Sequence, residues 1–159
     1  MENTRLCPLG DLAALAGELL QRGKRVRMRV RGWSMGPAIR DGEVVWLASA
    51  QAAQLHRGDV VLYLSGAGRP VIHRVLRRGR GARFYIAADG VPRQGEWVAG
   101  PAICGRVVAV ERAGRCISLA GWRGRLEGWF FLALRPFRPL LRSLRRHPPP
   151  APPSRRTSV

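Results

Sequence analysis

The chain is poor in cysteine, and this excludes two common ways of holding a small domain together. Its three cysteines are Cys7, Cys104 and Cys116, and none of them has the Cys-X-X-Cys spacing of a zinc knuckle. An odd number of thiols does not form a closed set of disulfides. We therefore expect neither a disulfide framework nor a structural metal site.

Long apolar runs are also missing. The chain contains no stretch of about 18 apolar residues, the length that a transmembrane helix needs. Its N-terminal segment carries acids where a signal peptide has its basic region, and Asp11 and Glu18 interrupt the apolar residues there. We expect neither a signal peptide nor a transmembrane helix, and a location in the cytoplasm or, as a peripheral protein, at the inner face of a membrane.

Lysine is scarce too, although the chain is strongly basic. Lys24 is the single lysine, and arginine supplies the rest of 28 basic residues, against 10 acidic residues and a net charge of +18. Such an excess favours nucleic acid or an anionic membrane as a partner. An ordinary solvated surface has the same composition, so the charge alone leaves the partner open.

The residues that are present indicate one mainly β domain. A length of 159 residues with 46% hydrophobic composition is enough for one core. Apolar spacing predicts a helix over residues 9–21, with Asp11 as N-cap and Gly23 as its stop. Period-two alternation predicts strands at residues 26–30, 43–47, 59–64, 71–76, 83–87 and 106–112. The predicted fold class is mainly β (α+β), an antiparallel β domain with a short N-terminal helix.

Four regions follow along the chain: the N-terminal helix (1–23), the β domain (24–121), a basic amphipathic region (122–146) and a proline-rich tail (147–159) expected to be disordered. From Trp122 to Arg146, large apolar residues interleave with arginine, and Pro136 and Pro139 split the pattern into short helical segments. These segments could lie on an anionic membrane or pack against the β domain.

The most distinctive stretch lies between the first two predicted strands. Ser34 sits there at a sharp corner between a strand and the Gly36-Pro37 turn. A serine presented in this way can act as a nucleophile, and nearby backbone N–H groups can face a substrate carbonyl oxygen. A serine that only caps a turn fits the same local pattern.

A resemblance to a known family favours the nucleophile. The spacing Gly32-X-Ser34-Met35-X-Pro37 resembles the nucleophile box of signal peptidase I and of the self-cleaving repressors. Their next box is a Gly-Asp before an apolar strand, which Gly58-Asp59 matches. The resemblance implies that Ser34 attacks a peptide bond, with Met35, Pro37 and Asp59 as supporting residues.

The box that follows carries the catalytic base. In the bacterial signal peptidases and the repressors it is a lysine, whereas the archaeal and endoplasmic-reticulum enzymes have histidine, and His73-Arg74 resembles the histidine version. The residues agree independently, because no lysine follows Lys24 and a Ser-Lys pair needs one near the serine. An imidazole can take and return a proton near neutral pH. A merely structural histidine in the strand is the alternative for His73.

A third group would orient the imidazole. Asp89 follows a predicted strand where the family has a Gly-Asp, with Ala88 here in place of the glycine. Glu96 is the nearest match to a second acid of the histidine branch. The resemblance therefore implies Asp89 as the orienting acid. A role for Asp89 in a turn, and Glu96 in its place, stay open.

The resemblance also implies a mechanism. Ser34 attacks, His73 acts as base and then acid, and an acyl-enzyme is hydrolysed without a metal or other cofactor. Many signal peptidases place a hydroxyl two residues before the nucleophile. Gly32 stands there, so the oxyanion donor is expected to be backbone, most simply the Ser34 N–H. The family binds its peptide or protein substrate as an extended strand. Neither the family's transmembrane anchor nor a helix-turn-helix is visible, which suggests a stripped catalytic domain.

A rival interpretation is a non-catalytic basic β module. Its arginines, at residues 25–31 and 135–146, would hold nucleic acid or anionic lipid. Nucleic acid is the less favoured of the two, because the aromatic residues gather in the C-terminal region and do not alternate with arginine on the strands.

Overall fold

The computed structural model describes residues 9–91 and 95–119, and within them the chain is mainly β. Eight strands form one antiparallel sheet, accompanied by a single α-helix, α1 (Leu9–Gln21), and two short 3-10 turns at Ala52–Gln54 and Gly100–Ala102. The predicted fold class is confirmed at this level. The regions 122–146 and 147–159 lie outside the described residues.

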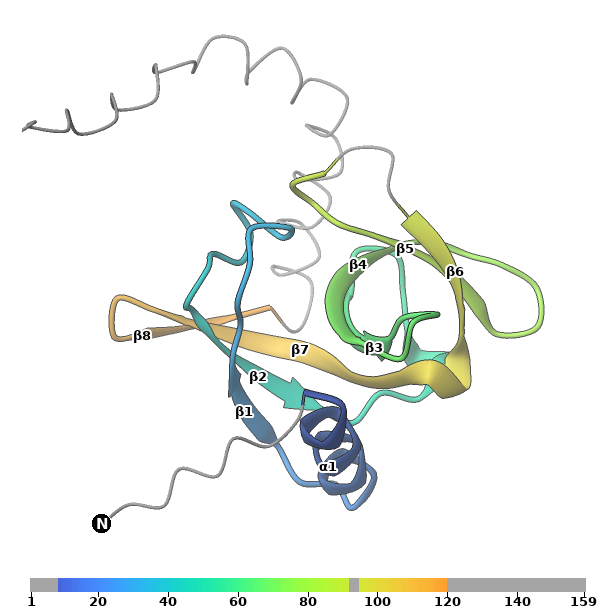
Figure 1. Ribbon diagram of the computed structural model, residues 1–159, viewed down its shortest axis with the longest axis horizontal. Helices are drawn as coiled ribbons and strands as arrows, with labels where there is room; N and C mark the ends of the chain where they lie inside the picture. The colour runs from blue at the N-terminus through green and yellow to red at the C-terminus, as the bar shows by residue number, and fades with distance from the viewer. Residues whose placement is uncertain (1–8, 92–94, 120–159) are drawn as a thin grey trace, which may run out of the picture.

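The sheet has an order that differs from the order of the sequence. Its path is β1 (Val26–Arg29), β2 (Val44–Ala48), β7 (Ile103–Arg112), β3 (Val60–Leu64), β4 (Pro70–Arg78), β5 (Arg83–Ala87) and β6 (Gly95–Ala99), and β8 (Arg115–Ser118) pairs with β7 alone. Figure 1 shows β7 running across the molecule, with β1, β2 and β8 on one side and the tightly curled β3 to β6 on the other. We call these two parts the open half and the curled half.

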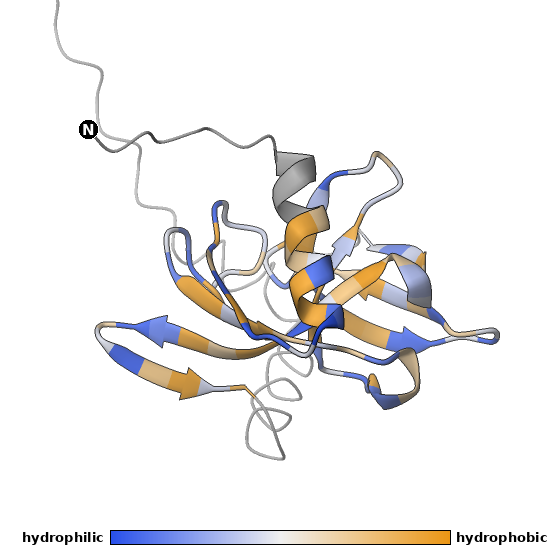
Figure 2. Ribbon diagram, turned by 90° about the horizontal axis from the view of Figure 1, so that it is seen from below, coloured by the Kyte–Doolittle hydropathy of each residue, from blue (hydrophilic) through white to orange (hydrophobic). Residues whose placement is uncertain are grey.

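Each half has its own core. Strand β3 contributes to both, because alternate residues of a strand point to opposite faces: Leu62 packs in the first core and Tyr63 in the second. The first core lies under α1 and includes Leu20, Met35, Ile39, Leu47 and Val110. The second core fills the curled half and includes Leu55, Val61, Phe84, Ile86 and Val98. Figure 2 shows the apolar segments of the strands gathered around α1.

Helix α1 packs directly on the central strand. A Cβ atom at Gly105 of β7 would lie 2.6 Å from the Leu20 Cδ1 atom, so only glycine permits this approach. The helix ends at Gln21, and Gly23 follows as the predicted stop, with a φ of +75°. The Lys24 N–H donates to the Leu19 carbonyl. The predicted N-cap is wrong, because Asp11 lies inside the helix, which begins at Leu9.

Two strands were missed by the periodicity argument. Strand β8 has four residues and follows β7 through a two-residue turn, Ala113-Gly114, in which both residues have positive φ. That is the geometry of the tight turns that favour β-hairpins. Strand β6 begins at Gly95 and has little alternation, and β7 begins at Ile103, before the predicted residue 106. Both missed strands are mostly exposed and lack the alternation of apolar and polar residues by which β1 was predicted.

Candidate active site

Ser34 lies in the loop that connects β1 to β2, and hydrogen bonds across the base of this loop hold it in place. The backbone pairs Val30 with Glu43 at the base of this turn, at a N···O distance of 2.8 Å. The Gly32 N–H donates to the Asp41 carboxylate at 2.7 Å, with the Gly32 φ at +105°, which favours glycine. Ser34 itself is half-buried. The hairpin therefore presents the serine at the exit of β1, as predicted.

The supporting residues of this turn divide into buried and exposed ones. Met35 is 2% exposed and Ile39 is 1% exposed, so both side chains anchor the turn in the first core. Pro37 is exposed and follows a cis peptide bond. Met35 thus supports the serine through packing. The turn's own hydrogen bonds use the N–H groups of Gly36 and Ile39. They leave the Ser34 N–H, within residues 30–43, without an intramolecular acceptor.

An apolar groove of about 680 Å³ opens beside Ser34. One wall is the edge strand β1 and its continuation to Gly32, and the opposite wall is Pro70, Val71 and Ile72 at the start of β4. Leu15 and Leu19 of α1 also line the groove. Ser34 therefore lines the same groove as the segment immediately before His73.

His73 is held in the middle of β4, directly opposite Val61 of β3. Its side chain is half-buried. The Nδ1 atom lies 3.3 Å from the Tyr63 hydroxyl oxygen, and that hydroxyl donates to the Glu96 carboxylate at 2.9 Å. Three strands of the curled half, β3, β4 and β6, thus contribute one side chain each to a chain of contacts.

The surroundings of His73 act on its charge in opposite directions. Burial lowers the pKa of the imidazole and is the largest effect, while the negative charges of Asp89 and Glu96 act to raise it. The net pKa lies below the ordinary value of histidine. His73 is therefore neutral, and able to accept a proton, at pH 7.

Asp89 takes part in a buried ion pair. Its carboxylate accepts three hydrogen bonds from Arg74, at 2.7 to 3.1 Å, and both side chains are only 5% exposed. Arg74 also donates to the Gly58 carbonyl at 2.7 Å. The pair fixes the residue next to His73. A direct orienting hydrogen bond from Asp89 to the imidazole stays a prediction. The negative charge of Asp89 acts to raise the pKa of His73.

The residue after Asp89 connects this ion pair to the serine. The Gly90 N–H donates to the Ser34 carbonyl at 2.7 Å. A Cβ atom at Gly90 would lie 2.9 Å from the Trp33 carbonyl oxygen and 3.1 Å from that of Ser34, so the two segments approach as closely as glycine allows. Asp89 and Gly90 therefore link the position of Ser34 to that of β4.

Asp59 has a structural position at the entry to β3. It is buried, accepts a hydrogen bond from the His56 N–H at 2.8 Å, and lies 3.8 Å from Arg106. Its carbonyl accepts from the Val75 N–H at 2.8 Å. Asp59 therefore fixes the register of β3 against β4, which in turn sets where His73 stands. His56 is exposed.

The described hydrogen bonds do not join Ser34 to His73. Ser34 and Ile72 line the same groove, whereas His73, the next residue of β4, points to the opposite face and contacts Tyr63 of the second core. The hydrogen bonds of the described residues include none between the Ser34 hydroxyl and His73. Sequence reasoning named Ser34, His73, Asp89 and Glu96 as candidates, and it did not name Tyr63. The missed signal was a tyrosine at the end of the apolar run that follows Gly58-Asp59.

A metal site and a membrane-spanning helix are both absent from the part of the chain that the structure describes. There, no three His, Cys, Asp or Glu side chains are grouped so as to hold a metal ion. Within residues 9–91 and 95–119, no helix is both long and apolar enough to cross a bilayer.

Compared with models of known protein families and with curated proteins, the chain matches none.

Proposed function

We propose that the protein is a serine endopeptidase of the signal peptidase type, with Ser34 as nucleophile and His73 as general base. The observation that carries the proposal is the apolar groove, which is lined by Ser34 and by the residues just before His73. A serine that lines such a groove, with a neutral imidazole on the strand that contributes to the lining, supplies the residue types that acyl transfer needs.

The groove suits an extended peptide. Strand β1 is at the edge of the sheet, so its outer backbone groups are available to pair with a substrate strand. The walls carry Val26, Met28, Val30, Leu62 and Ile72, which favour small or apolar substrate side chains. The proposed substrate is a precursor or membrane-associated protein with such a segment, and its scissile carbonyl would lie over Ser34.

The chemistry would use the groups of the chain alone. His73 accepts the Ser34 hydroxyl proton as the oxygen attacks the carbonyl, and returns it to the leaving amine. The Ser34 N–H is directed to no acceptor within its own turn and is the proposed oxyanion donor. Asp89 contributes negative charge near His73, and Glu96 does so from β6. Water then hydrolyses the acyl-enzyme.

A peptide cleavage assay tests the proposal. The full chain is incubated with a library of peptides that carry alanine or other small residues, and the products are read by mass spectrometry. Ser34→Ala and His73→Ala should abolish the cleavage. Ser65→Ala is the matched control, because Ser65 is a half-buried turn serine whose hydroxyl only accepts a 3.3 Å hydrogen bond from the Arg69 N–H. Cleavage that survives Ser34→Ala would refute the proposal.

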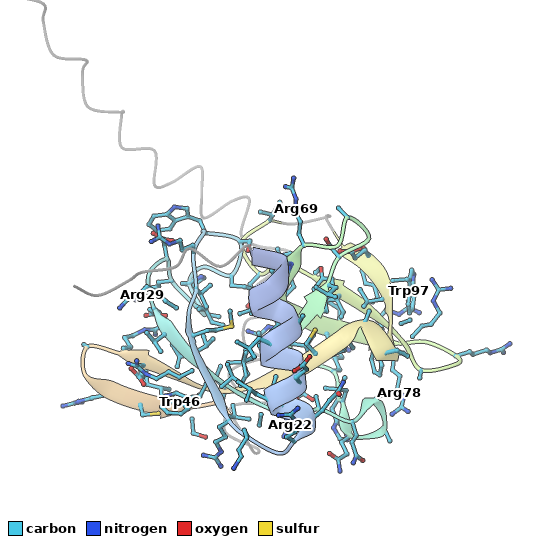
Figure 3. The ribbon with its side chains drawn as sticks, turned by 60° about the horizontal axis from the view of Figure 1, so that its bottom comes forward. Arg22, Arg29, Trp46, Arg69, Arg78 and Trp97 are labelled. Atoms are coloured by element: carbon cyan, nitrogen blue, oxygen red, sulfur yellow. The ribbon has the colours of Figure 1, made fainter. Side chains whose placement is uncertain are left out.

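A second candidate function rests on a different surface. A cleft of about 950 Å³ between β1, β2 and the β7–β8 hairpin is lined by five arginines: Arg25, Arg27, Arg29, Arg112 and Arg115. Arg29 and Trp46 lie on this side of the molecule (Figure 3). Anionic lipid is the occupant that this charge would attract, alone or together with the segment from Trp122 to Arg146.

Two features make this binding module the weaker candidate. Arg27 already pairs with Glu111, and Arg112 with Glu43, so part of the positive charge is compensated. The other labelled arginines, Arg22, Arg69 and Arg78, point to different sides of the molecule (Figure 3). Sedimentation with anionic vesicles at increasing salt would test it, because an electrostatic site loses its ligand as salt rises.

A further inference from the structure

We propose that Tyr63 is a positioning residue, backed by Glu96, that fixes which nitrogen of the His73 imidazole carries the proton. This inference rests on the proposed function and adds a residue that the sequence argument did not include. It begins from a contact between strands that are not neighbours in the sheet. Strands β4 and β5 separate β3 from β6, yet the Tyr63 hydroxyl reaches Glu96 at 2.9 Å. The curl of β3 to β6 makes this contact (Figure 1).

The direction of the two hydrogen bonds follows from the number of protons. A tyrosine hydroxyl has one proton, and an ionised carboxylate can only accept. The Tyr63 proton is therefore directed to Glu96, and the lone pairs of the oxygen are left for the neighbour at 3.3 Å, the Nδ1 atom of His73. Two acceptors would repel each other, so Nδ1 must be the protonated nitrogen.

The consequence is a defined tautomer of the neutral imidazole. With the proton on Nδ1, the Nε2 atom carries a lone pair and is the nitrogen that can take the Ser34 proton. When it does, the proton moves from Ser34 Oγ to His73 Nε2, and Nδ1 keeps its proton and its bond to Tyr63. No proton leaves Tyr63. Glu96 stabilises the resulting cation through the tyrosine hydroxyl, which it polarises.

Burial supports this assignment. Tyr63 is 1% exposed, and burial together with the hydrogen bond to Glu96 and its charge raises the pKa of Tyr63 well above the ordinary value. The hydroxyl therefore stays protonated, and stays a donor to Glu96, through the whole pH range in which a peptidase works. A buried hydroxyl also has no water to bond instead.

The titratable groups around His73 come from several strands and loops. Tyr63 is on β3, Glu96 on β6, and Asp89 follows β5. Beyond β3, Arg106 on β7 stands opposite Val61 and is 3.8 Å from Asp59, to which its charge is directed. Of these groups, only Tyr63 contacts the Nδ1 atom in a way that selects the tautomer.

Nitrogen NMR of the His73 ring in the full chain tests the proposal without a substrate. The wild-type protein should show protonated Nδ1 and bare Nε2 at neutral pH. Tyr63→Phe keeps the ring in the core and removes only the acceptor, so the Nε2-protonated form should gain population. Tyr85→Phe is the matched control on β5 and should leave the ring signals unchanged. A wild-type ring protonated on Nε2, or a tautomer unaffected by Tyr63→Phe, would overturn the proposal.

Glu96→Gln separates charge from orientation. Glutamine still offers an oxygen to the Tyr63 hydroxyl, so the tautomer should persist while the pKa of His73 falls with the lost negative charge.

In the cleavage assay, Tyr63→Phe should lower kcat by about tenfold to 100-fold and leave KM unchanged. The acid limb of its pH–rate profile should shift to lower pH. If Ser34→Ala leaves cleavage unchanged, the peptidase assignment fails while the NMR result still decides the role of Tyr63. A Glu96→Gln protein that loses the tautomer would show that the carboxylate charge, and not Tyr63, selects it.

Discussion

The two halves of the sheet treat their polar groups differently. In the open half, the ion pairs are more exposed: Arg27 has 54% of its side chain exposed where it meets Glu111, and Arg112 has 31% where it meets Glu43. In the curled half, the pair of Arg74 and Asp89 is 5% exposed on both sides, and Tyr63 places a hydroxyl in the core next to His73. Removing such groups from water is costly unless each finds a partner. Among the described ion pairs, the pair in the curled half is the most fully buried, so its stability depends most on each group keeping its partner.

The comparison predicts unequal responses to the loss of one charge. Asp89→Ala leaves Arg74 buried without its partner and should lower the free energy of unfolding by about 3–5 kcal/mol. Glu111→Ala breaks the exposed pair with Arg27 and should change stability only slightly, because solvent screens both groups. Urea unfolding of the two variants measures the difference. Equal losses would contradict the distinction between the halves.

The close approach of Gly90 to the serine turn predicts a local effect. Gly90→Ala places a Cβ atom 2.9 Å from the Trp33 carbonyl oxygen, so the turn that carries Ser34 must move. We expect a loss of about 1–3 kcal/mol in stability. We also expect a drop in cleavage larger than that stability loss explains, because Ser34 is displaced.

Gly66→Ala is the control for this change. Gly66 lies in the β3–β4 turn with nothing within 4 Å of the added atom, and it should leave stability and cleavage close to wild type. If Gly90→Ala cleaves normally, the linkage between the Asp89-Gly90 segment and the serine is wrong.

The buried imidazole predicts a pH response from the curled half. The pKa of His73 is lowered by burial, so the unfolded chain binds a proton at higher pH than the folded one. The contribution of His73 to stability is therefore full above the ordinary range of histidine and decreases as pH falls through that range. Cleavage should lose its base only at pH values below that range. The difference in unfolding free energy between wild type and His73→Gln, followed from pH 8 to pH 5, measures this contribution. A difference that grows toward acidic pH would contradict it.

The smallest effect is expected in the open half. The pKa of Glu111 is lowered to about 2 by hydrogen bonds from Arg27 and Trp46 and by the charge of Arg27. Its stabilising effect is present above the ordinary range of glutamate and is lost only as pH falls toward 2. Because both groups are exposed, we expect Glu111→Gln to alter the acid unfolding midpoint little, and less than Asp89→Asn does in the same titration.

The sequence predicted the main elements wherever their periods were long enough. Helix α1 has the predicted ends, since the apolar spacing and Gly23 determine them, and the alternation of Val26 and Met28 with arginine marks β1. Asp11 was wrongly predicted to cap the helix, because the helix continues through two residues before it. Strands β6 and β8 are mostly exposed and show no clear alternation of apolar and polar residues.

For the candidate site, the sequence supplies residue types and not contacts. Ser34, His73 and Glu96 were named from local boxes and stay candidates, whereas the contact of Tyr63 with Glu96 depends on the curl of four strands, which no local pattern contains. Asp89 was predicted to orient His73, and the structure shows its carboxylate bonded to Arg74. The sequence suggested that Asp89 lies near His73, but it does not show which basic group the carboxylate pairs with.

The most direct test of the central claim is covalent capture of the acyl group on Ser34. The full chain is mixed with the nitrophenyl ester of a capped apolar peptide ending in alanine, a substrate that acylates faster than it is hydrolysed. The account predicts a burst of nitrophenol and a mass increase of one acyl group that peptide mapping assigns to Ser34, absent in Ser34→Ala and retained in Ser65→Ala. No adduct, or an adduct that persists in Ser34→Ala, would contradict it.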